Sequence, residues 1–189
     1  MGDPGIRLKI PELNLVVDSI VTLNRDGSVV KADTLKALSK VKVYCHVEDE
    51  TGNVLSQYNG IVSATLKDKK TKITTKANKV FTREVDNKKV FERADPFNYY
   101  EYTNILYSGS SVISNGKFEI QMIIPKDINY KVDYGRLSMY AYDEENGWDA
   151  MGANENILIG GSASDIEPDD VGPYINVTTN GGKFKDGYN

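Results

Sequence analysis

The chain has 189 residues and a mass of 21.0 kDa, enough for one domain that buries a substantial hydrophobic core. Its 40% hydrophobic and 26% charged residues are typical of a globular protein and exclude a wholly disordered chain. The net charge of -4, with acidic and basic residues interspersed, leaves no broad positive face, so we expect no nucleic-acid partner. No apolar run of about 18 residues occurs and the start MGDPGIRLKI is unlike a signal peptide, so we expect no membrane insertion.

The chain has one cysteine and one histidine, Cys45 and His46. A single cysteine excludes an internal disulfide framework, and a single histidine excludes a zinc site built from several Cys and His ligands. Because neighbouring residues of a strand point to opposite faces, the thiol and the imidazole cannot form the hydrogen bond that a nucleophile and its base require. We therefore expect no catalytic residue and no cofactor in this chain, with Cys45 facing the core and His46 the surface.

Frequent Tyr, Gly, Thr, Val and Ile predict an all-β protein. Residues 12–23 predict a strand that ends in the turn NRDG at residues 24–27, so a hairpin is expected there. Residues 33–38 are too few for a stable helix and predict a loop or a single turn. Residues 41–49 alternate most clearly, with four apolar side chains on one face: Val41, Val43, Cys45 and Val47.

Further strands are predicted at residues 61–66, 117–125, 136–142 and 156–159, with a tight hairpin turn at Asn146-Gly147. Strands at this spacing favour an immunoglobulin-like β-sandwich over residues 1–163, with a long insertion at about residues 67–114. Residues 164–189 are predicted to be a linker and the truncated start of a following β region, because too little chain remains for a second domain.

The insertion combines a lysine cluster with a group of tyrosines. Because Asp68 interrupts the lysines at positions 67, 69, 70 and 72, we favour a solvated loop or a guarded strand edge over a patch for anionic polymers. The tyrosine rings either line a groove for glycan or peptide or pack over the sandwich. A contiguous exposed patch would favour binding, and burial would favour a supporting role, for the four rings of Tyr99, Tyr100, Tyr102 and Tyr107.

The segment DEENGWD at residues 143–149 places several carboxylates around a turn, as a hard cation such as calcium requires. The candidate ligands are Asp143, Glu145 and Asp149. The segment lacks the ligand spacing of an EF-hand loop, and its Asn-Gly dipeptide is typical of a hairpin turn. We therefore favour an acidic hairpin tip over a calcium site.

Several separated segments resemble, in the expected order, the region that follows the catalytic domain in gingipain-like cysteine peptidases. The similarity is closest to the cell-surface sortase of the Bacteroidetes type IX secretion system. It is carried by GDPGIRLKIP (2–11), DTLKALSKV (33–41), GNVLSQYNG (52–60), NGKFEIQMIIPKDINY (115–130), GRLSMYAYD (135–143), and ILIGG followed by DVGPYI.

This resemblance implies that the Gly-Asp-Pro tripeptide at residues 2–4 closes a caspase-like peptidase domain and that an immunoglobulin-like sandwich follows it. The catalytic cysteine and histidine of the family lie upstream of that tripeptide, so their roles are not carried over to Cys45 or His46. It further implies a place at the cell surface or outer membrane of a Gram-negative bacterium, in a parent that processes the C-terminal sorting signals of secreted cargo.

Two hypotheses of different classes follow. In the first, the chain is a structural module that braces the upstream caspase-like peptidase domain in cis, with secretion-system proteins as further partners. In the second, it is a binding module whose Tyr-rich insertion contacts glycan, peptide or a secretion partner, because aromatic anchors carry much of the energy at such sites.

Overall fold

The computed structural model describes residues 10–77, 80–86, 88–93, 95–164, 178–179 and 182–183. Across these ranges the regular secondary structure is entirely β, which confirms the all-β prediction. The body contains β1 (Leu13–Leu23), β2 (Val29–Lys31), β3 (Leu35–Ala37), β4 (Lys40–Glu48), β5 (Gly60–Lys67), β10 (Ile105–Ile113), β11 (Lys117–Ile123), β12 (Asp133–Asp143) and β13 (Trp148–Ser162). The remaining strands are β6 (Thr71–Thr74), β7 (Val80–Val85), β8 (Lys88–Arg93), β9 (Asn98–Glu101), β14 (Thr178–Thr179) and β15 (Gly182–Lys183).

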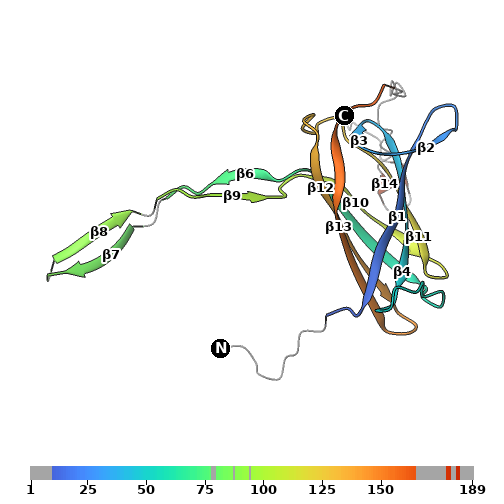
Figure 1. Cartoon of the computed structure of the whole chain (residues 1–189), viewed down its shortest axis with the longest axis horizontal. Helices are drawn as coiled ribbons and strands as arrows, with labels where there is room; N and C mark the ends of the chain where they lie inside the picture. The colour runs from blue at the N-terminus through green and yellow to red at the C-terminus, as the bar shows by residue number, and fades with distance from the viewer. Residues whose placement is uncertain are drawn as a thin grey trace.

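The body strands form one nine-stranded sheet along the path β10-β5-β12-β13-β1-β4-β11, with β2 paired to β1 and β3 paired to β13. The two ends of this path, β10 and β11, follow each other in the chain. Between them Ser111 Oγ donates a hydrogen bond to the carbonyl oxygen of Glu119 at 2.7 Å. The sheet therefore curls around a core and is nearly closed (Figure 1). The finer assignment to an immunoglobulin-like sandwich stays a prediction.

The core is made by the inward-facing half of each alternating strand. In β4 the burial pattern alternates residue by residue, as the sequence predicted, and β11 and β12 follow the same rule. Each fully buried aliphatic side chain stabilises the fold by about 1.5–3 kcal/mol. The predicted inward residues of these three strands are all buried: Val41, Val43, Cys45, Val47, Phe118, Ile120, Met122, Leu137, Met139 and Ala141.

Three predicted strand assignments differ from the structure. Residues 33–38 were expected to be a loop or turn, but β3 pairs in parallel with β13 and buries Leu35 and Ala37. Residues 156–159 are part of the 15-residue strand β13 and not a separate strand. Strand β10 lies within the predicted insertion at 67–114, yet it pairs with β5 from Ile105 to Ile113 and so belongs to the body. In each case a pairing partner distant in sequence decides the structure.

Strands β1 and β13 pair in parallel, with Leu13 opposite Ala150 and Asn14 opposite Met151. Their backbones approach closely at Gly152, where an added Cβ would lie 2.0 Å from the carbonyl oxygen of Leu15. Only glycine fits this close approach, because any other residue would place its Cβ inside the van der Waals radius of that oxygen.

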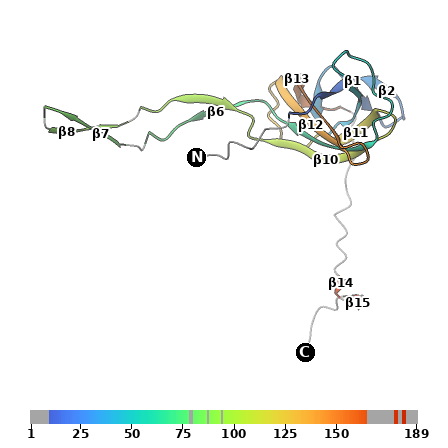
Figure 2. The ribbon, with the colours of Figure 1, turned by 90° about the horizontal axis from the view of Figure 1, so that it is seen from below.

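An arm made of two strand pairs projects from the body. Strand β6 pairs with β9, and further along the same excursion β7 pairs with β8. Figures 1 and 2, viewed at right angles, both show these pairs extending away from the sheet. The arm occupies the middle of the predicted insertion. Of the predicted linker and following β region at residues 164–189, the structure describes residues 164, 178–179 and 182–183, and the rest lie outside the described residues.

Candidate functional site

The structure places Cys45 and His46 on opposite faces of β4. Cys45 is buried with its Sγ 4.0 Å from Met139 Sδ, whereas His46 lies on the outer face. Burial, assisted by the negative charge of Asp18, raises the pKa of the Cys45 thiol to about 12. A thiol that stays protonated and has no imidazole within reach is not an activated nucleophile.

His46 has partners that the sequence did not indicate. Its Nδ1 lies 2.7 Å from Asp18 Oδ1 and its Nε2 lies 3.5 Å from Glu48 Oε2. The register between β1 and β4 shifts between Val17 and Ser19, which inserts Asp18 as an extra residue. This irregularity sets Asp18 beside the imidazole. A bulge depends on the pairing of two strands, so the sequence pattern of either one does not reveal it.

The acidic hairpin tip is organised around the buried carboxylate of Asp143. One oxygen accepts backbone hydrogen bonds from Glu145 at 3.0 Å and Asn146 at 3.1 Å. The other accepts from Asn146 Nδ2 at 2.8 Å and from the Asn59 backbone at 3.3 Å. Burial alone would raise the pKa of Asp143, but these hydrogen bonds outweigh burial and lower it.

Asp143 therefore acts as a structural acceptor that joins the turn to the loop before β5. Of the other two candidate calcium ligands, Glu145 is exposed and Asp149 is half-buried. In the part of the chain that the structure describes, no group of three or more His, Cys, Asp or Glu side chains is arranged to hold a metal ion. The same residues contain no helix long and apolar enough to cross a membrane.

The four tyrosines of the predicted interaction site do not form one patch. Tyr99 and Tyr100 are exposed on β9, where as neighbours in a strand they face opposite sides of the arm. Tyr102 is half-buried, and the ammonium of Lys70 lies 4.9 Å from its ring centroid. Tyr107 belongs to β10 and packs against the core of the body.

The exposed part of this set forms two separate surfaces of the arm. On one face Tyr99 lies opposite Ile73 and contacts Phe97, with ring centroids 5.9 Å apart. On the other face Tyr100 lies opposite Lys72. Phe97 and Tyr100 are 62% and 65% exposed, so both faces offer aromatic surface to a partner.

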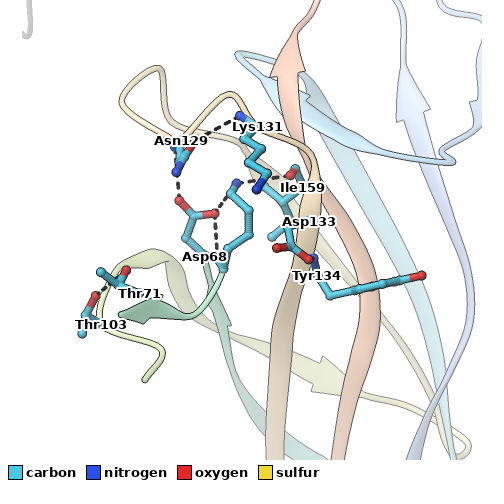
Figure 3. Close-up of polar contacts among 9 residues, drawn as sticks. Asp68, Thr71, Thr103, Asn129, Lys131, Asp133, Tyr134 and Ile159 are labelled. Atoms are coloured by element: carbon cyan, nitrogen blue, oxygen red, sulfur yellow. Dashed lines mark hydrogen bonds and ion pairs between the residues drawn. The ribbon is translucent and has the colours of Figure 1, made fainter. Parts of the chain in front are cut away.

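The arm is anchored to the body by a buried ion pair between consecutive residues, Asp68 and Lys69. Lys69 Nζ lies 2.7 Å from Asp68 Oδ1 and donates to the carbonyl oxygen of Ile159 in β13 at 3.2 Å. The second carboxylate oxygen accepts from the backbone of Asn129 at 3.3 Å, and the Asp68 backbone N–H donates to the carbonyl oxygen of Asn104 at 2.8 Å. Figure 3 shows the contacts of this pair with Asn129 and Ile159, which join the start of the arm to two other segments of the body.

Burial alone would raise the pKa of the Asp68 carboxyl. The hydrogen bonds from the Lys69 side chain and from the backbones of Lys69 and Asn129 outweigh that effect, so the pKa is lowered and the carboxylate stays charged. The expectation of a solvated lysine cluster is therefore wrong at this position. Lys69 is only 7% exposed, whereas its neighbour Lys70 is exposed. The one feature of the sequence that could have indicated this ion pair is the position of Asp68 between Lys67 and Lys69.

Comparisons with known proteins find similarity to part of a larger protein. No family model matches the chain, and no curated protein matches it. The chain resembles a part of PorU. A crystal structure of dimeric latent PorU from Porphyromonas gingivalis superposes with a TM-score of 0.61 at 28% identity. The similarity covers 87% of this chain and 14% of the PorU chain, so the present chain spans a small part of that protein.

A second solved structure is far less similar. Spo0M, a sporulation control protein from Bacillus subtilis, has a TM-score of 0.33 and 12% identity over 79% of this chain and 49% of its own. A similarity at this level carries no argument. The PorU match and the resemblance of the sequence segments agree that the chain is similar to one region of a larger protein.

Proposed function

We propose that this chain is a non-catalytic, immunoglobulin-like structural module of a cell-surface cysteine peptidase of the type IX secretion sortase class. The observation that carries the proposal is the similarity to PorU, a sortase of that system, at 28% identity over 87% of this chain. In the proposed parent, a caspase-like domain processes the C-terminal sorting signals of secreted cargo. The module supports that domain in cis at the cell surface, with secretion-system proteins as further partners.

The chemistry of the described residues supports the non-catalytic part of this proposal. Cys45 is buried, its thiol has a pKa of about 12, and His46 lies on the other face of the same strand. A rigid, nearly closed sheet with a continuous apolar core is suited to holding a neighbouring domain at a fixed distance.

Peptidase activity in the parent polypeptide tests the proposal. We expect the parent to cleave a peptide that carries a sorting signal, and Cys45→Ala in the parent to leave this activity unchanged. The isolated 189-residue chain should not cleave the same peptide. Cleavage by the isolated chain that is lost in Cys45→Ala would overturn the non-catalytic assignment, and a parent without a caspase-like domain would overturn the family assignment.

The arm favours a second candidate function, namely binding of a protein partner through its exposed faces. A two-stranded ribbon is only marginally stable in water on its own, so a long ribbon that projects from a domain gains stability when a partner covers it. Lys and Arg outnumber Asp and Glu between residues 69 and 104, whereas the whole chain has a net charge of -4. The partner surface that fits the arm is therefore apolar with an acidic surround.

Substitution of the exposed rings tests this second function. Tyr99→Ser with Tyr100→Ser should reduce co-purification of the parent with a tagged secretion-system component. Tyr44→Ser is the matched control, because Tyr44 is 38% exposed on the body and Tyr99 is 38% exposed on the arm. Equal co-purification of the wild type and the double variant would rule out binding through these rings.

A further inference from the structure

One end of the outer face of the sheet carries a cluster of exposed apolar side chains. Five residues on four strands are between 47% and 68% exposed. We call this set the end patch: Ile61, Val112, Tyr140, Tyr142 and Met151.

The strand register makes the end patch contiguous. In one row Val112 of β10 lies opposite Ile61 of β5, and Ile61 lies opposite Tyr142 of β12. In the next row Tyr140 lies opposite Met151 of β13. Residues directly opposite each other on neighbouring strands have their Cβ atoms about 4.5–5.5 Å apart. The two rows are next to each other because Tyr140 and Tyr142 lie two residues apart on the same face of β12, so the five side chains form one continuous surface.

The two rows that follow the end patch on the same face differ from it. The first row carries small or hydroxylated side chains at Thr65, Ser138 and Ala153. The second row carries the charged side chains of Lys67 and Arg136. Single exposed apolar residues are ordinary on protein surfaces, but a contiguous cluster is typical of an interaction site. The contrast along one face places that site at one end of the sheet.

The end patch adjoins the place where the described chain begins. Strand β1 starts at Leu13 opposite Ala150, and Asn14 lies opposite Met151 of the end patch. Ile10, just before this strand, is 71% exposed. The described chain therefore enters the module beside the end patch, so a domain joined before residue 10 would have a high effective concentration at this surface.

A cleft of about 250 Å³ continues the surface past Asp149, the residue opposite Tyr142. Its walls are apolar, from Leu13, Leu55 and Trp148, and its acidic groups are Glu12 and Asp149. The turn after Tyr142 adds the exposed carboxylates of Glu144 and Glu145. An apolar floor beside an indole and an acidic rim suits the stem and charged head of a lysine or arginine side chain.

We propose that the end patch and the Trp148 cleft form the docking surface for the domain that precedes this module in its parent polypeptide. This inference rests on the proposed function, because it takes the chain to be one module of a longer protein, as the 14% coverage of PorU suggests. The docked domain offers an apolar surface with a basic rim, and one of its lysine or arginine side chains enters the cleft.

Thiol labelling at single positions tests this docking. Ile61→Cys and Tyr142→Cys are introduced separately into the parent polypeptide and into the 189-residue chain. The matched control is Ile123→Cys, because Ile123 is 59% exposed and Ile61 is 62% exposed, but Ile123 lies opposite Lys40, away from the end patch. Maleimide labelling is followed by peptide mass spectrometry, and the buried Cys45 thiol does not interfere.

We expect positions 61 and 142 to react at least about tenfold more slowly in the parent than in the isolated chain, because the centre of a docked interface excludes water. Position 123 should react within about twofold in the two proteins, as exposed sites outside interfaces do. Equal rates at positions 61 and 142 in the two proteins would overturn the inference.

Two further outcomes separate this inference from the proposed function. If positions 61 and 142 react as fast in the parent as in the isolated chain and the parent has an active caspase-like domain, the docking surface is overturned. The proposed function is then unaffected. Protection by a preceding domain with no peptidase activity would support the docking surface and overturn the proposed function. Protection in the isolated chain that increases with protein concentration would assign the end patch to a second copy and overturn the proposal.

Discussion

The ammonium nitrogen of Lys69 lies 2.7 Å from Asp68 Oδ1, so two consecutive residues form a buried ion pair where the arm leaves the body. Side chains of neighbouring residues in a regular strand diverge, so this contact requires the chain to leave strand geometry directly after β5, which ends at Lys67. The pair therefore marks the transition from the sheet to the arm. Its further contacts with Asn129 and Ile159 connect that transition to the body.

Removal of the lysine from this pair should be strongly destabilising. Lys69→Met leaves the Asp68 carboxylate buried without its cation, and we expect a loss of about 3–5 kcal/mol in the free energy of unfolding. Urea denaturation followed by circular dichroism measures the effect. Lys70→Met is the control, since Lys70 is exposed and its contact with the Tyr102 ring stabilises by about 0.5–1 kcal/mol.

The double variant Asp68→Asn with Lys69→Met separates pairing from packing. Because it leaves no unpaired buried charge, it should recover most of the stability that Lys69→Met loses. If the double variant were as unstable as the single variant, the ion pair would not be the cause.

The thiol of Cys45 should be unreactive in the folded protein. Burial raises its pKa from 9.0 to about 12, which reduces the thiolate fraction near pH 8 by a factor on the order of 10³. Alkylation by iodoacetamide at pH 8 should therefore be slower by at least this factor in buffer than in concentrated urea. Labelling in buffer at a rate close to that in urea would contradict both the burial and the raised pKa.

Stability should fall in acid because of Asp68 and Asp143. The pKa of each carboxyl is lowered from its ordinary value of 3.8 in the folded protein. The unfolded state therefore binds protons first, and the stabilisation is fully present above about pH 5 and is lost as the pH falls through the lower folded values. At Asp68, protonation also leaves Lys69 without a counter-charge.

A variant isolates the contribution of the hairpin tip to this acid dependence. Asp143→Asn should be less stable than the wild type at pH 7, and its unfolding free energy should decrease less steeply below pH 4. Denaturation series between pH 2.5 and pH 7 measure both slopes. Parallel curves for the two proteins would show that Asp143 is not responsible.

The close approach of β1 and β13 predicts that Gly152→Ala is destabilising. The new Cβ would lie 2.0 Å from the Leu15 carbonyl oxygen, so one of the two strands must shift. Overpacking of this kind costs about 1–3 kcal/mol. Thermal unfolding measures the change, and Ala153→Ser, on the exposed side of the same strand, should alter stability by less than about 0.5 kcal/mol. An unchanged melting temperature in Gly152→Ala would contradict the approach.

Much of the body was predictable from local alternation. Strands β4, β11 and β12 bury the side chains that their period of two predicted, because a strand with one face on a core needs an apolar residue at every second position. The hairpin turns at residues 24–27 and at Asn146-Gly147 were also predictable, since each has residues suited to tight turns.

The sites were less predictable than the strands. The opposed directions of Cys45 and His46 follow from their adjacency in one strand, and the structure confirms them. Tyr107 was grouped with the arm tyrosines, but it lies on the body, in strand β10, which pairs with β5. The partners of His46 and the burial of Lys69 depend on a bulge and on contacts with β13, which no local pattern encodes.

The sequence by itself determined that the chain is all-β, which faces of its main strands are buried, and that its only thiol and only imidazole point apart. Each of these properties depends on neighbours within one strand, so the pleat of the backbone is sufficient to decide it. Only the tertiary structure decided that β3 and β10 join the sheet, that Asp68 and Lys69 pair in the interior, and that five separated apolar residues meet at one end of an outer face. These features require the register between strands distant in the chain, and that register is set when the core closes around all of them at once.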